Sequence, residues 1–379
     1  MRKLRICIIA CTAVLSGACA RFGDNAFINP PELSDGDRET SVEGVEGVNL
    51  FVFDAPFDSP VFGYKIYSSG EDALNDPVKW TLLGSDRGRK WEVLDIREGQ
   101  AFCSRYQEIY CAVAVPAKYK RYMLEVETAD GRAPVIAEVE FFDKDIMTGW
   151  YGFKYPEIDF KVADPDTEGA ALYTRMVQDP EEYVRYHARK VCEILFWRAD
   201  DPMYDVRKID YTLRDYDGIS AKGGSPPEIY IEYSTRHVEK SAEESFYKLD
   251  YETRGVLFHE LVHAYQHEPK GIGSYSTNQE FWACIEGLAD AVRSEAGFFD
   301  IEALRKPGGH WLDGYRTTGF FLQWLTTKDP DAIRKFHVTV RDLDVWSFDK
   351  AMKELFGEES GIEQKWEEYQ EFLGLEENI

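Results

Sequence analysis

The chain lacks several features that would narrow its class at once. Beyond its first five residues it has no run of basic side chains, and 44 Lys and Arg against 69 Asp and Glu leave a formal net charge of -25. That balance argues against nucleic-acid binding, which needs clustered Lys and Arg, and against adsorption to anionic lipid. No apolar run is long enough to span a bilayer, and there is no internal repeat. A C-x-x-C pattern is also absent, which disfavours a zinc site built from cysteine alone.

What is present is the composition of a globular protein. Hydrophobic residues make up 44% of the chain and aromatic residues 14%, so a packed core is easily supplied. A length of 379 residues allows two domains of ordinary size.

The N-terminus has the pattern of a cleaved export signal. Basic residues precede a short apolar run, Ile6 to Leu15, and small residues then lead to Cys19. Small residues directly before a cysteine are typical of a bacterial lipoprotein signal, with a plain secretory signal as the alternative. We therefore expect removal of residues 1–18, lipidation of Cys19, and export to a bacterial (outer) membrane or cell surface with no other membrane contact. Residues 19–48, rich in Gly, Asp, Glu and Ser, predict a tether or a loose domain edge.

Five cysteines remain after removal of this signal, namely Cys19, Cys103, Cys111, Cys192 and Cys284. Cys103 and Cys111 flank a predicted turn and could pair in an oxidising compartment. Cys192 and Cys284 are expected to be buried small apolar residues.

Residues 49–145 have the texture of an all-β domain. Seven short runs rich in β-branched and aromatic residues are separated by Asp, Gly, Asn and Pro. The runs are 49–54, 61–69, 79–85, 90–96, 109–115, 121–128 and 135–142. Their number and length predict an antiparallel sandwich or barrel.

This segment resembles the discoidin (F5/8 type C) family. The stretch DPVKWTLLGSDRGRKWEVLDIREGQ and the later RYMLEVET and AEVEFF follow that family's pattern. The matching residues are Trp80, Gly84, Ser85, Asp86, Gly88, Trp91, Leu94 and Asp95. The resemblance implies a jelly-roll sandwich, a fold that often binds carbohydrate. The part of the pattern that usually carries the ligand loops is short here, so a spacer without a ligand is the alternative.

After Met147 the sequence predicts an α+β, mostly helical domain over residues 150–379. Residues 180–199 carry apolar side chains at helical spacing. Residues 206–234 predict two strands around a loop rich in Gly and Pro, and helices are expected to follow to the end of the chain. The domain boundary is predicted near residues 143–155.

The stretch GVLFHELVHAYQH places His259, His263 and His267 at intervals of four residues, and Asp250 is a plausible cap for its helix. Residues four apart share one helix face, so His259 and His263 can offer ring nitrogens to one metal ion. Glu260, rotated by about 100°, can hold a water molecule, as in zinc peptidases. His267 lies about 12 Å along the axis from His259, too far to share that metal. It is expected to lie on the surface or to support the site indirectly, and the third ligand must come from elsewhere.

A metzincin arrangement fails because Gln266 and Pro269 stand where its glycine and last histidine would be. A following stretch, NQEFWACIEGLADAVRSEAGF, carries Glu286 and Asp290 four residues apart on one helix face. This pattern resembles the gluzincin group of zinc peptidases. The resemblance implies that Glu286 is the third zinc ligand and that Asp290 braces a ligand histidine. Glu280 is a weaker alternative ligand.

Three blocks in order resemble the plant basic secretory protein family and its bacterial relatives, which are zinc peptidases. They read GVLFHELVHAYQ, EGLADAVRSEAG and WLDGYRTTGFFLQWL, and the resemblance covers roughly residues 155–375. It implies a zinc metallopeptidase with His259, His263 and Glu286 as ligands. Peptide bonds would be hydrolysed by a zinc-activated water with Glu260 as the general base.

Other features bear on substrate and partners. Tyr315 is the first candidate to stabilise the oxyanion and His310 the second, with a packed tyrosine as the alternative. The strand at Pro227–Ser234 is expected to run beside an extended substrate, or to be an ordinary sheet strand. The expected partners are a protein or peptide substrate, with or without attached glycans, and a carbohydrate ligand of the β domain. Two other functions stay open: a glycan-binding adhesin with an inert zinc domain, and a glycopeptidase acting on glycoproteins.

Overall fold

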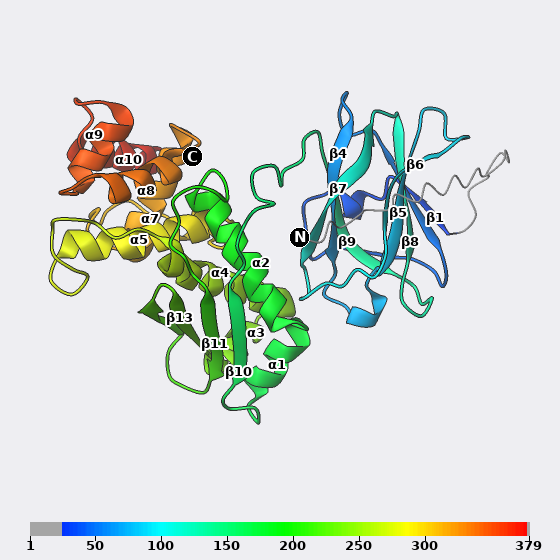
Figure 1. Cartoon of the computed structure of the whole chain (residues 1–379), viewed down its shortest axis with the longest axis horizontal. Coiled ribbons are helices and arrows are strands. Elements are labelled where there is room, and N and C mark those ends of the chain that lie inside the picture. The colour runs from blue at the N-terminus through cyan, green and yellow to red at the C-terminus, as the bar shows by residue number, and fades with distance from the viewer. Residues whose placement is uncertain (1–24, 377–379) are drawn as a thin grey trace, which may run out of the picture. The chain divides into compact units, whose positions relative to one another are not determined.

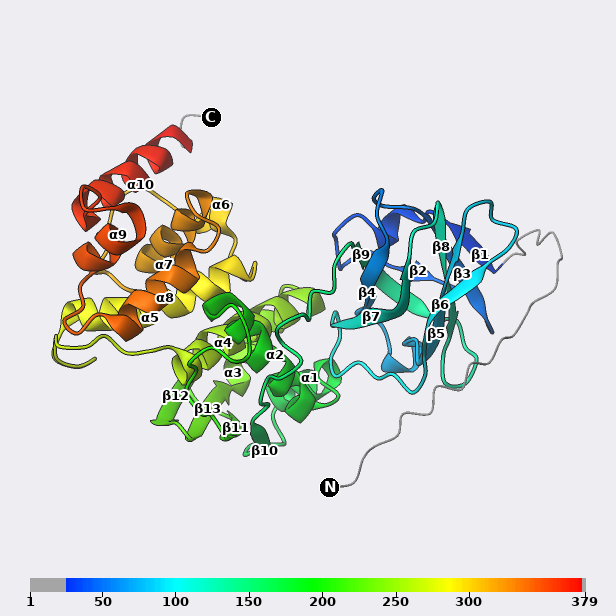
Figure 2. The same ribbon diagram turned by 45° about the horizontal axis from the view of Figure 1, so that its top comes forward.

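The computed structural model describes residues 25–376, which form two compact units (Figures 1 and 2). The first unit ends at Ile146 and the second begins at Met147, within the predicted boundary interval. The second unit also includes Phe102–Gln107, a segment between two strands of the first.

The predicted export signal and Cys19 lie outside the described residues. Among the helices that are described, none combines the length and apolar character needed to cross a bilayer.

The first unit is a sandwich of two sheets, as predicted. One sheet has the order β1 (Ala26–Ile28), β3 (Asn49–Asp54), β8 (Arg121–Glu127), β5 (Lys79–Ser85) and β6 (Glu92–Arg97). The other has the order β2 (Val42–Glu43), β9 (Val135–Phe142), β4 (Val61–Ser68) and β7 (Glu108–Ala117). All seven predicted runs form strands, β3 to β9, and every pairing is antiparallel except that of β1 with β3.

Of the two predictions for residues 19–48, the tether is wrong for the described part, residues 25–48, which instead forms an edge of the sandwich. Strand β1 pairs with β3, and β2 pairs with β9. The backbone N–H of Gly36 also donates to Glu138 Oε2 at 3.0 Å. A composition rich in Gly and acidic residues therefore did not prevent this segment from joining the sandwich, because its backbone groups find partners on strand edges.

The discoidin-like residues contribute to the sandwich core. The indole N–H of Trp80 donates to the Tyr64 hydroxyl at 2.8 Å, and that hydroxyl donates to Asp95 Oδ2 at 2.8 Å. The same oxygen accepts from Arg97 Nε at 2.7 Å. This network satisfies a buried carboxylate, so these motif residues have a structural role whether or not a sugar binds elsewhere.

The four described cysteines are all buried and free. The sequence left open whether Cys103 and Cys111 pair, and in this structure they do not: Cys103 belongs to the second unit and Cys111 to β7 of the first. Cys192 and Cys284 are buried, as predicted.

The second unit contains a four-stranded sheet. Its order is β10 (Glu157–Val162), β11 (Lys208–Arg214), β13 (Glu228–Ser234) and β12 (Ser220–Ser225). The first three strands are parallel, and β12 runs antiparallel to β13 at the edge. The predicted Gly/Pro loop thus contains a strand, SAKGGS, which has little β propensity of its own. Gly223 leaves room there for the Tyr230 ring on β13, because a Cβ atom would lie 1.9 Å from Tyr230 Cζ and the ring would have to move.

Ten α-helices complete the described part of this unit. They are α1 (Glu168–Met176), α2 (Pro180–Leu195), α3 (Thr235–Ala242), α4 (Phe246–Tyr265), α5 (Gln279–Glu295), α6 (Ile301–Leu304), α7 (Tyr315–Trp324), α8 (Ala332–Asp342), α9 (Phe348–Phe356) and α10 (Ile362–Glu376). In both views the sheet lies at one end of the unit, α9 and α10 lie at the other, and α4 and α5 lie between them (Figures 1 and 2). The prediction of a mostly helical second domain is confirmed.

Helix α4 carries the histidine motif through the middle of this unit. Its cap is Ser245, whose side chain accepts from the Lys248 backbone N–H, so the predicted cap at Asp250 is wrong. Asp250 is instead buried in the helix and accepts from Arg254 Nε at 2.8 Å. Most of α4 is buried, including the charged residues Asp250, Arg254 and Glu260.

Candidate metal centre

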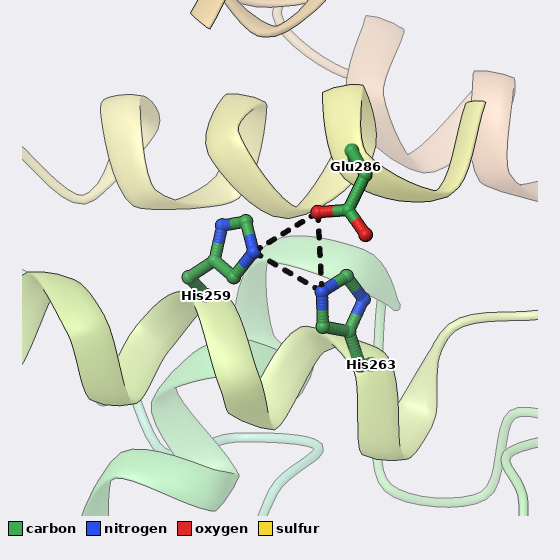
Figure 3. Close-up of side chains that lie close together, drawn as sticks. All are labelled: His259, His263 and Glu286. Atoms are coloured by element: carbon green, nitrogen blue, oxygen red, sulfur yellow. Dashed lines mark hydrogen bonds and ion pairs between the residues drawn. The ribbon is translucent and has the colours of Figure 1, made fainter. Parts of the chain in front are cut away.

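His259 and His263 lie one turn apart on α4, and Glu286 faces them from α5 (Figure 3). The two Nε2 atoms are 3.1 Å apart, and Glu286 Oε2 lies 3.3 Å from that of His259 and 3.6 Å from that of His263. Ligand atoms of a tetrahedral zinc ion with bonds of about 2.0–2.1 Å are separated by about 3.3 Å. Among the described residues, these three form the single group suited to hold a metal ion.

The other ring nitrogens are held by residues outside this group. His259 Nδ1 lies 2.7 Å from Asp290 Oδ1, as the gluzincin-like pattern implied, and His263 Nδ1 lies 2.6 Å from the Gln266 amide. Both rings are therefore fixed with Nε2 directed at the space that Glu286 also faces. Carboxylate and amide partners of this kind orient histidine ligands and set their tautomer.

The electrostatics of the site favour positive charge. Burial opposes protonation of His259, but the carboxylates of Asp290 and Glu286 outweigh it and raise its pKa to about 10. Burial would raise the pKa of Glu286, but hydrogen bonds from His259 and His263 outweigh it and hold that pKa well below its usual range. Two carboxylates and two imidazoles that converge in this way stabilise a cation, which is the requirement of a metal site.

Glu260 is buried on α4 next to these ligands. Its Oε1 accepts a hydrogen bond of 2.6 Å from the Ser220 hydroxyl at the start of β12. The sequence pointed to Glu260 but missed Ser220, because the two residues are 40 positions apart and β12 was not recognised as a strand.

Two tyrosines border the candidate metal ligands. Tyr275, in the loop before α5, donates to Glu286 Oε1 at 2.6 Å and so leaves Oε2 directed at the histidines. The ring of Tyr315 stacks on His259 with centroids 6.0 Å apart and also contacts Trp282. Tyr315 is therefore placed beside the site, as predicted, whereas Tyr275 had no motif or periodicity that could have revealed it.

The remaining candidates are not part of the group. Glu280, the alternative ligand, accepts from the Phe348 backbone N–H at 2.7 Å at the start of α9. His310 is exposed and its ring stacks on the adjacent Trp311.

His267 is not on the surface, which corrects one of its two predicted placements. It is buried, and its ring stacks on His337 with centroids 4.8 Å apart. Its backbone N–H donates to His337 Nε2 at 2.8 Å. The helix ends at Tyr265, so His267 leaves the face that His259 and His263 share.

Two roles were predicted for Pro227–Ser234, and the structure agrees with the ordinary sheet strand, β13, rather than with a strand whose edge takes a substrate. Strand β13 is paired on both sides, by β11 and β12. The edge of the described sheet next to α4 is β12, whose first residue, Ser220, contacts Glu260. Only an edge strand has backbone groups available for an added chain.

Comparison with known proteins gives the following likenesses. Among proteins of curated function, none matches this sequence. Solved structures resemble the N-terminal region weakly. One is the CBM32-5 module of CpGH89 from Clostridium perfringens, solved in complex with GalNAc-β-1,3-galactose. It has 12% identity and a TM-score of 0.27, and the match covers 34% of this chain and 91% of that module. The F5/8 type C domain of a Bacteroides fragilis protein has 14% identity and a TM-score of 0.27, covering 31% of this chain and 81% of its own.

The second unit gives the decisive match. A family model described as peptidase of plants and bacteria matches residues 155–369, which is more than half of the chain and includes every residue of the metal group. This range agrees with the predicted extent of the resemblance. The chain therefore belongs to this family of peptidases of plants and bacteria.

Proposed function

We propose that the protein is a zinc peptidase in which His259, His263 and Glu286 bind the metal and Glu260 is the general base. One observation carries the proposal: three ligand atoms converge at separations of 3.1, 3.3 and 3.6 Å beside a buried glutamate. Separations near 3.3 Å are those of a tetrahedral zinc site.

A zinc ion bound there would lower the pKa of a water molecule and polarise the scissile carbonyl group. Glu260 would take the proton of the attacking water and later give it to the leaving amine. The hydrogen bond from Ser220 holds the Glu260 carboxylate in one orientation for this transfer. Asp290 and Gln266 keep the two histidine rings in place.

Tyr315 is proposed as the donor to the oxyanion. Its side chain is 48% exposed, so its hydroxyl can reach a bound substrate. Burial and the nearby carboxylates of Glu286 and Asp290 raise the pKa of Tyr315, which keeps the phenol protonated and able to donate. An extended substrate would pair with the edge strand β12 as an additional strand. Such pairing uses backbone hydrogen bonds, so it does not depend on the amino-acid sequence of the substrate.

Export and lipid attachment at Cys19 are also part of the proposal, supported by the N-terminal sequence pattern. Cys19→Ala should move the protein from the membrane fraction to the soluble fraction of the exported material. Retention of the variant in membranes would contradict lipidation at this residue.

The central experiment compares three variants of the full chain. Glu260→Gln should keep about one zinc per chain and lose peptide cleavage, because the amide cannot take up the proton. Glu286→Ala should lose most of its zinc. Glu280→Gln is the matched control, a glutamate of the same helix whose carboxylate contacts α9 rather than the metal group.

The readouts are metal content by mass spectrometry and cleavage of a proteome-derived peptide library. Cleavage by Glu260→Gln at the wild-type rate would refute the mechanism, and unchanged zinc in Glu286→Ala would refute the ligand set. Glycan-array binding by a chain that holds zinc but cleaves no peptide would favour the adhesin instead.

A further inference from the structure

A pocket of about 390 Å³ adjoins the candidate metal centre. It is formed by the loop before α5 and the first turn of that helix, and is lined by Tyr275, Ser276, Thr277, Asn278, Gln279 and Trp282. None of the mechanistic roles described above uses this pocket.

Both aromatic walls of the pocket touch residues of the metal centre. The Tyr275 hydroxyl donates to Glu286 Oε1 at 2.6 Å. Trp282 packs edge-on against Tyr315 with centroids 5.5 Å apart, and Tyr315 stacks on His259. A group held in the pocket would therefore lie next to the substrate atoms that react.

The lining is unusual in what it omits. It has no Asp, Glu, Lys, Arg or His, although such charged side chains (DEKR) make up 30% of the chain, and it has no aliphatic side chain. Charged substrate side chains would find no partner here and aliphatic ones no matching wall. The lining instead offers two aromatic rings with hydroxyl and amide groups.

The two amides are held in fixed orientations. Asn278 Oδ1 accepts from the Phe281 backbone N–H at 2.9 Å, which leaves the amide nitrogen as a donor to a ligand. Gln279 Nε2 donates to the Leu312 carbonyl at 2.8 Å, which leaves the amide oxygen as an acceptor. Fixed donors and acceptors in a pocket that also has two aromatic rings suit a neutral ligand with hydroxyl groups and flat apolar faces, which is the chemistry of a sugar ring.

We propose that this pocket, the Tyr275–Trp282 pocket, binds a neutral sugar attached to the substrate beside the scissile bond, so that the enzyme prefers glycosylated peptides. The inference rests on the proposed peptidase function and names its substrate class. A site built to hydrogen-bond a substrate group discriminates strongly against an analogue that lacks the group.

The test uses pairs of synthetic peptides of identical sequence, with and without N-acetylgalactosamine on a central threonine. The threonine is moved along peptides that the enzyme cleaves, and kcat/KM is measured for each pair. The expected result is a preference of at least about tenfold for one glycosylated register. Equal rates at every register would overturn the inference while leaving the peptidase proposal intact.

Ser276→Trp places an indole at the pocket, and Glu358→Trp adds the same side chain at an exposed loop position between α9 and α10. The first variant should lose the preference and keep its zinc, whereas the second should behave as wild type. A preference that survives Ser276→Trp would place the sugar elsewhere, for example on the sandwich, and would overturn the inference.

The inference remains testable if no peptide is cleaved. Zinc-loaded Glu260→Gln is then titrated with the same peptide pairs by calorimetry, with Ser276→Trp added as a second change. Binding of the glycosylated peptide at least about tenfold tighter, lost with Ser276→Trp, would support the pocket although the peptidase proposal had failed. Equal affinities would overturn it.

Discussion

The contact between Asp290 and His259 supports a quantitative prediction about metal affinity. Asp290 is 4% exposed, and its Oδ1 lies 2.7 Å from His259 Nδ1. Asp290→Ala removes this partner and frees the ring to rotate. Asp290→Asn keeps the size of the side chain and an oxygen that can accept a hydrogen bond from His259 Nδ1–H, but it removes the negative charge.

The size of the effect follows from the kind of contact. Loss of a partner that orients a metal-bound histidine lowers affinity by about 10–100-fold, or about 1.4–2.7 kcal/mol. A hydrogen bond to a charged group is worth about 1.5–3 kcal/mol, which gives the same range. We therefore expect the zinc Kd to rise about 10–100-fold in Asp290→Ala and by less than about tenfold in Asp290→Asn.

The assay is competition for zinc against a chromophoric chelator at constant pH. Asp300→Asn serves as the matched control, because Asp300 caps the short helix α6 away from the metal group and asparagine caps equally well. Circular dichroism establishes that each variant is folded. A folded Asp290→Ala with the wild-type Kd would show that His259 does not depend on this carboxylate, and the reasoning about the site would fail.

Three other predictions concern packing and charge. Gly319→Ala would place a Cβ atom 2.7 Å from that of Asp290, so α7 must shift; we expect about 1–3 kcal/mol of destabilisation and weaker zinc binding, and an unchanged Tm and Kd would contradict this. Asp250→Ala removes the buried carboxylate that pairs with Arg254 at 2.8 Å and should lower the free energy of unfolding, measured by urea denaturation, by about 3–5 kcal/mol; an unchanged free energy would contradict this. Burial raises the pKa of Glu138 to about 7, so this residue should make the sandwich less stable as the pH rises from about 4.5 to 7. Glu138→Gln should remove that loss, worth about 3 kcal/mol at pH 8, and the same slope of stability against pH in both proteins would refute it.

Much of the fold was predictable because its signals are local. The seven strands β3 to β9 follow runs of β-branched and aromatic residues, and α2 follows helical spacing within one segment. The histidine pair was predictable for the same reason, since positions four apart on one helix share a face. Strand β12 was missed for a related reason. Its sequence, SAKGGS, has weak strand propensity, and only its pairing with β13 makes it a strand.

The candidate site was predictable only in part. A carboxylate on the following helix was expected, but both Glu280 and Glu286 lie on α5, and a family resemblance rather than spacing favoured Glu286. Packing of α5 on α4 turns Glu286 toward the histidines, while Glu280 meets the start of α9.

The sequence by itself determined which helix bears His259, His263 and Glu260, the residues proposed to bind the metal and to act as the general base. Only the tertiary structure decided which side chains surround them. Ser220 donates to Glu260, Tyr275 donates to Glu286, and Tyr275 also lines the uncharged Tyr275–Trp282 pocket. The physical reason is that periodicity describes one element at a time. Contacts between residues 40 or 11 positions apart depend on how a strand, a loop and two helices pack together, and no single segment carries that information.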